Sequence, residues 1–85
     1  MSLISIKSAT YGVPGREVDV AFTIQCMPGV GACFKHAEIQ VNNASMRVDP
    51  APGIAKRLRV VYRMGFEETV VEVLEGHTMH IPARE

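Results

Sequence analysis

The chain has 85 residues, of which 47% are hydrophobic and 21% are charged. This balance predicts a folded globular protein and excludes the polar, highly charged composition of disordered chains. Nine basic residues balance nine acidic ones, so no net charge attracts the chain to nucleic acid or to an anionic membrane. We expect one domain over residues 1–85, because a chain of this length has no room for a second core.

The sequence carries no targeting or anchoring signal that we recognise. No stretch approaches the roughly 20 apolar residues of a membrane span, and the N-terminus lacks the basic segment and apolar run of a secretory signal. We therefore expect no membrane span, and the cytoplasm is favoured while the compartment stays open. Cys26 and Cys33 are too few for the disulfide framework of a small secreted domain, so two reduced cysteines are favoured over a bridge.

The first third of the chain predicts two strands. Leu3 to Thr10 is rich in isoleucine, serine and threonine, and Tyr11–Gly15 ends this run with two glycines and a proline. From Arg16 to Cys26 the apolar residues fall on alternate positions, which predicts a half-buried strand. The alternating residues are Val18, Val20, Phe22, Ile24 and Cys26.

The middle of the chain predicts one short strand and one loop. Ile39 and Val41 alternate with polar residues over Ala37–Asn42, which indicates the strand. Asp49–Gly53 contains two prolines and a glycine, so this segment cannot join a β-ladder and must be a surface loop. Because no window shows sustained apolar spacing of three and four residues, we expect little or no helix, with at most one turn near Cys33–Ala37.

A strand with one apolar and one basic face is predicted after this loop. Leu58, Val60, Tyr62 and Met64 share one parity, and Arg57, Arg59 and Arg63 share the other. A two-residue turn at Met64–Gly65 would place Leu58 opposite Val71 and Arg57 opposite Glu72. Glutamates would then neutralise much of the arginine row, so a solvated, paired face is favoured over a site for phosphate or a polyanion.

The next reversal, at Leu74–Gly76, predicts that the last strand pairs Val71 with Met79. This arrangement is a three-stranded meander. Six short strands separated by turns favour an all-β fold, either a sandwich or a small barrel. We expect a small two-sheet antiparallel β-sandwich with little or no helix.

No group of residues predicts an active site or a metal site. His77 and His80 point to opposite faces of a strand, and His36 has no acidic or cysteine partner at ligand spacing. Cys33 and His36 lie close enough in sequence to touch, but nothing supplies the third member of a catalytic triad. We therefore expect no catalytic residue, no metal and no cofactor.

The order of short motifs along the chain resembles that of a known domain. The motifs are Ala9–Gly12, Val18–Val20, Val41–Asn43, Asp49–Gly53 and Lys56–Tyr62. Together they resemble a domain of unknown function, the C-terminal domain of mitochondrial J-domain (DnaJ-type) proteins linked to cristae organisation. The resemblance spans nearly the whole chain, although Val18–Ala21 lacks the threonine of the family's pattern. It implies a β-rich accessory module of assembly proteins and names no substrate.

Two functions follow as hypotheses. The favoured one is a non-catalytic module that binds protein, either a partner or another copy of itself, through an exposed edge strand at Leu3–Thr10. The alternative is a small-ligand module for carbohydrate or calcium, working through loops 11–15 and 49–53. The candidate binding residues are Tyr11 as an exposed aromatic, Asp19 and Asp49 as oxygen ligands or loop anchors, Lys56 as a tie to the loop, and Arg57 and Arg59 on the basic face.

Overall fold

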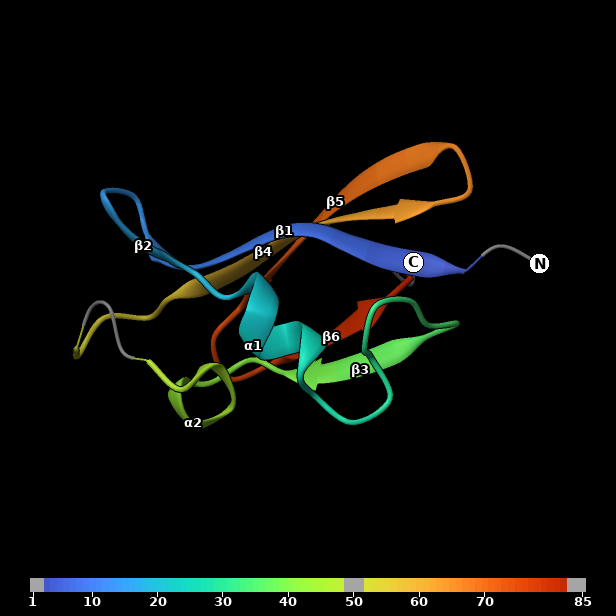
Figure 1. Ribbon diagram of the computed structural model, residues 1–85. Helices are drawn as coiled ribbons and strands as arrows, with labels where there is room; N and C mark the ends of the chain where they lie inside the picture. Colours follow the sequence, from blue (N-terminus) through green and yellow to red (C-terminus); the bar gives the residue numbers. More distant parts are fainter. Residues whose placement is uncertain (1–2, 49–51, 83–85) are drawn as a thin grey trace.

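The computed structural model describes residues 3–48 and 52–82. Six strands form two antiparallel sheets, and two short helices connect them (Figure 1). The strands are β1 (Ile4–Val13), β2 (Arg16–Asp19), β3 (Ala37–Gln40), β4 (Arg57–Met64), β5 (Glu67–Leu74) and β6 (Thr78–Ile81), and the helices are α1 (Ala21–Gln25) and α2 (Asn43–Met46). The predicted all-β fold with two antiparallel sheets is confirmed.

The larger sheet has the strand order β2-β1-β4-β5. Strand β1 therefore lies between β2 and β4, but β2 pairs only with Thr10–Val13, so it meets the predicted edge Leu3–Thr10 at Thr10 alone. The tight reversal at Pro14–Gly15 pairs Val13 with Arg16 and lets β2 cover the C-terminal end of β1, whereas Ile4 at the other end forms a β-bridge with Phe34. The strand also continues through Tyr11 to Val13, residues for which the sequence predicts a turn.

The smaller sheet pairs β3 with β6 and lies below β1 and β4, with α1 between the layers (Figure 1). Alternation along β1 and β4 turns one face of the larger sheet toward this second sheet, and the buried side chains of both form one core. Its fully buried members include Ile4, Tyr11, Leu58, Ile39 and Met79. Two layers that share one core are what a chain of this size needs to bury its apolar faces.

The strand predicted from Arg16 to Cys26 is wrong beyond Asp19, where the chain turns into helix α1. A carboxylate oxygen of Asp19 accepts a hydrogen bond from the backbone N–H of Ala21 at 2.9 Å, which favours a turn over continued extension. Val20 and Ile24 are both buried. Their spacing of four residues places them on one face of a helix, so the same apolar residues serve a helix as well as a strand.

The β4–β5 hairpin keeps the predicted faces but not the predicted register. Leu58 lies opposite Val73 and Val60 opposite Val71, because the turn residues are Gly65 and Phe66. Gly65 has a φ of 65°, the positive value that the first position of this turn class requires. The register differs from the prediction by two residues, which leaves every side chain on its predicted face.

Strand β6 pairs with β3 and not with β5, so the predicted meander is wrong. Met79 lies opposite Ile39. The chain crosses between the sheets near Gly76, whose N–H donates to the Val41 carbonyl at 2.8 Å, while the Val41 N–H donates to the His77 carbonyl at 3.0 Å. These bonds draw β6 beneath the larger sheet instead of alongside it.

The second helix also differs from the prediction. Helix is present at Asn43–Met46, where the Asn42 side chain accepts a bond from the Ser45 N–H at 2.7 Å. Near Cys33–Ala37, where the sequence allows a helical turn, Phe34 instead forms an isolated β-bridge with Ile4.

Candidate functional site: the β5 edge and the outer sheet face

Strand β5 is one of the two edge strands of the larger sheet, and the shorter strand β2 is the other. Strand β5 pairs with β4 on one side, and no strand of residues 3–48 and 52–82 pairs with its other side. Figure 1 shows the β4–β5 hairpin projecting above the smaller sheet. Unpaired N–H and C=O groups along such an edge form a template for another strand.

Apolar side chains accompany this edge. Val70 is 49% exposed and Leu74 is 46% exposed, while Phe66 at the hairpin turn is 98% exposed. On the opposite face of β5, Val71 and Val73 are partly buried against the core. The outer face therefore offers apolar contact area, and the inner face anchors the strand.

Arg57 and Arg59 lie together at one end of the outer face, as the sequence predicted. Arg57 Nη1 is 3.6 Å from Glu72 Oε2, and Arg59 Nε is 3.7 Å from Glu72 Oε1. The predicted pairing of this arginine row with glutamate is thus observed at Glu72. Because all three side chains are about half exposed, each pair contributes at most about 1 kcal/mol to stability.

The two arginines line a hollow of 480 Å³ together with Glu17, Glu72 and Leu74. Gly12 also lines it, and a Cβ added there would overlap the Arg16 carbonyl oxygen. Backbone from β2 therefore occupies the space that a side chain would need. The hollow presents both charges, and Glu72 already contacts both arginines.

Tyr11 is fully buried, so it is not the exposed aromatic that the sequence suggested. Its strand continues past the expected turn, and this turns the ring into the core. The Tyr11 hydroxyl donates to Asn43 Oδ1 at 2.8 Å and links β1 to α2. Asp19 is the exposed last residue of β2 and lies opposite Thr10, and its carboxylate accepts a bond from Ala21. Asp49 falls outside the described residues.

Lys56 is 2% exposed although it carries an ammonium group. Its Nζ donates to the Ile54 carbonyl at 2.7 Å and lies 3.3 Å from Glu75 Oε1. The contact with Ile54 agrees with the prediction that this lysine ties down the preceding loop. Lys56 is therefore a structural residue at the base of the loop.

Within the part of the chain that the structure describes, no three His, Cys, Asp or Glu side chains gather closely enough to hold a metal ion. Cys26 and Cys33 are exposed and unbridged. Neither α1 nor α2 has the length and apolar run required to cross a bilayer.

Comparison with known proteins finds no matching family model, no matching curated protein and no matching solved structure. The resemblance to the J-domain protein module therefore stays a prediction that rests on the residue pattern. The geometry of the chain itself is what supports the candidate site.

Sequence reasoning missed the residues that make β5 an accessible edge. Val70 and Leu74 alternate with the core-facing residues Val71 and Val73, so the sequence pattern alone predicts that they are exposed. The position of β5 at the sheet edge was not, because it depends on β6 pairing with β3.

Proposed function

We propose that the domain is a non-catalytic module that binds another protein by adding an extended segment of that protein to the β5 edge. The observation that carries this proposal is the unpaired outer side of β5 among the described residues, with Val70 and Leu74 exposed beside it. Main-chain hydrogen bonds supply affinity in such complexes, and alternate side chains supply specificity.

The charge around β5 defines the partner's chemistry. Residues 65–76, which comprise β5 and its flanking turns, contain no lysine or arginine, and their acidic residues are Glu67, Glu68, Glu72 and Glu75. Glu72 contacts two arginines and Glu75 contacts Lys56. Glu67 and Glu68 remain to interact with a partner, so the added segment carries lysine or arginine near the hairpin turn and β-branched residues beyond it.

The same charges disfavour pairing of β5 with the β5 strand of a second copy. An antiparallel pair of these strands would bring glutamates from both copies onto one short ribbon, and like charges across a strand pair are destabilising. A basic segment of a different chain or of another part of this chain fits the edge better. Self-association through β5 alone is therefore the less favoured form of the function.

The test is binding of a fluorescein-labelled octapeptide in which lysine alternates with valine, measured by fluorescence polarisation. Val70→Lys places a charge on the solvent side of the edge, and we expect it to weaken binding by about tenfold or more. Ser8→Lys is the matched control, because Ser8 is exposed but pairs with Val61 of β4, so it lies two strands away from Val70 and the β5 edge. We expect that variant to bind within about twofold of the unmodified protein.

A second peptide examines the mode of binding. Proline in place of each valine removes the amide donors that a ladder needs, so this peptide should not bind. Equal affinity for the two peptides, or equal loss of affinity in the Val70 and Ser8 variants, would contradict strand addition at β5.

A further inference from the structure

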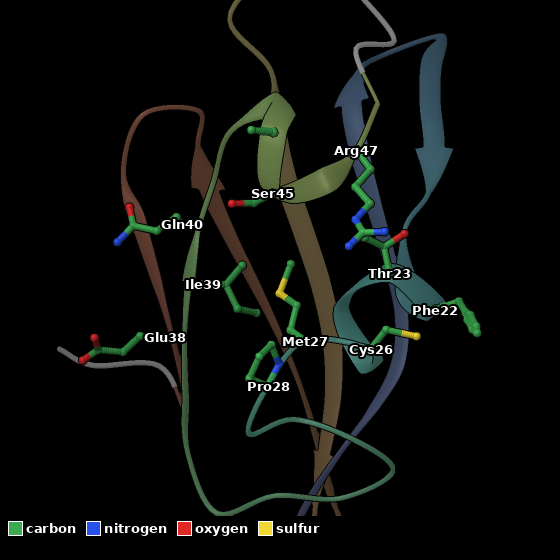
Figure 2. A pocket seen from close by; sticks show the side chains of 11 residues that line it. Phe22, Thr23, Cys26, Met27, Pro28, Glu38, Ile39, Gln40, Ser45 and Arg47 are labelled. Carbon is green, nitrogen blue, oxygen red and sulfur yellow. The ribbon is translucent and has the colours of Figure 1, made fainter.

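A second docking surface lies along the free edge of the smaller sheet. A groove of 560 Å³ runs between β3, α1 and α2 (Figure 2). Three consecutive residues of β3, Glu38 to Gln40, line it. Because side chains alternate along a strand, consecutive residues line one groove only where the backbone edge faces it. Within the described residues β3 pairs with β6 alone, so this edge is open.

One wall of the groove is apolar. Phe22 and Cys26 come from α1 and the residue that follows it, and Met27 and Pro28 come next in the chain. Phe22 is 65% exposed even though it belongs to a helix that packs on the core. Figure 2 shows Met27 and Ile39 facing each other across the groove. An extended segment placed here would bury apolar side chains while its backbone pairs with β3.

One basic side chain lines this groove. Arg47 follows α2 with a φ of 61°, and its guanidinium lies beside Thr23 inside the groove, whereas Glu38 points away from it (Figure 2). Glu38 Oε1 is 3.5 Å from His80 Nδ1. No described residue forms an ion pair with Arg47. A cation in the groove that has no ion-pair partner among the described residues favours an anionic group on the occupant.

We propose that this groove binds an extended peptide segment of a partner protein as a third strand beside β3, with an aspartate or glutamate of that segment on Arg47. Strand β3 runs toward the Arg47 end of the groove (Figure 2). In an antiparallel pair, as in the β3–β6 sheet, the acidic residue therefore precedes the apolar residues that contact Phe22 and Met27. This site is separate from the β5 edge and selects the opposite charge.

The probe is a fluorescein-labelled octapeptide with one glutamate followed by alternating threonine and valine. Arg47→Gly removes the guanidinium and suits the positive φ of this position, so we expect an intact fold with binding weakened about tenfold or more. Arg47→Lys keeps the charge and should bind within about threefold. Arg16→Gln removes a positive charge from the exposed strand β2 and should leave binding unchanged. Affinity equal in all four proteins would overturn the proposal.

Two further measurements locate the peptide. Backbone amide signals of Glu38–Gln40 should shift on titration, and a peptide with glutamine in place of glutamate should bind the unmodified protein as weakly as the glutamate peptide binds Arg47→Gly. If Val70→Lys alters the affinity of the glutamate peptide and Arg47→Gly does not, the peptide binds at β5 and the groove is excluded. If the glutamate peptide does not bind at the groove, the test of β5 with the lysine peptide is unaffected. If the lysine peptide does not bind at β5, the test of the groove is likewise unaffected.

Discussion

Lys56 and Glu75 close the base of the β4–β5 hairpin with contacts between both their side chains and their backbones. The Glu75 N–H donates to the Lys56 carbonyl at 2.7 Å, and the Lys56 N–H donates to Glu75 Oε1 at 3.2 Å. The Lys56 ammonium lies 3.3 Å from the same carboxylate oxygen. The two residues immediately flank β4 and β5, so together they fix the point at which the exposed hairpin leaves the core.

Removing one partner of this pair should lower the free energy of unfolding by more than removing both partners together. Glu75→Ala leaves a buried ammonium without this carboxylate, and we expect a loss of about 2 kcal/mol in the free energy of unfolding. This is a small loss for a broken buried ion pair, because Lys56 keeps its hydrogen bond to the Ile54 carbonyl. Lys56→Met combined with Glu75→Ala should recover part of the loss, as measured by urea unfolding in a double-mutant cycle. Strict additivity would contradict this coupling.

Phe22 and Ile24 distinguish the helix from the strand that the sequence suggested. Ile24 is fully buried, so Ile24→Ala should lower the free energy of unfolding by about 2–5 kcal/mol. Phe22 is largely exposed, so Phe22→Ala should change it by less than about 1 kcal/mol. In a strand the two residues would share one face and their costs would be similar. Thermal unfolding of the two variants settles the point.

Gly12 and Gly15 form a matched pair for the β1–β2 hairpin. A Cβ at Gly12 would overlap the Arg16 carbonyl oxygen, whereas a Cβ at Gly15 has nothing within 4 Å. We expect Gly12→Ala to cost more than about 3 kcal/mol and Gly15→Ala about 1–2 kcal/mol, the latter from its positive φ alone. Chemical denaturation measures both, and equal costs would show that β2 does not approach β1 so closely.

The positive φ of Arg47 has a measurable effect on stability that is independent of any ligand. Glycine at this position relieves the steric cost of the left-handed conformation, so Arg47→Gly should raise the free energy of unfolding by up to about 1 kcal/mol. Arg47→Ala keeps the strained φ without the guanidinium and serves as the control. A stability gain in the alanine variant equal to that of glycine would assign the effect to charge.

Which residues of β4 face the core could be predicted from the sequence, because Leu58, Val60 and Tyr62 occupy alternate positions and lie on one face of the sheet. The register of the hairpin could not, since shifts by two residues preserve parity and Gly65 serves either turn. Helix α1 was missed because Val20 and Ile24 satisfy strand and helix spacing alike. The strand that β6 joins depends on packing between the sheets, and no local pattern encodes it.

In the candidate site, too, local features could be predicted from the sequence and features set by the packing of strands could not. Arg57 and Arg59 were placed together correctly because neighbours on one face of a strand follow from alternation. Tyr11 was misplaced because its exposure depended on where the first turn begins. The open edges of β5 and β3 are properties of strand order, so they became visible only with the assembled sheets.

The pairing of β3 with β6 also bears on the order in which the chain folds. The β1–β2 and β4–β5 hairpins join neighbouring segments and close short loops, so they can form early. The smaller sheet cannot form until Thr78–Ile81 has been synthesised, which happens after the whole β4–β5 hairpin. Until then Ile39 has no cross-strand partner, and the apolar residues that will form the core of the nascent chain are exposed to solvent and to other proteins.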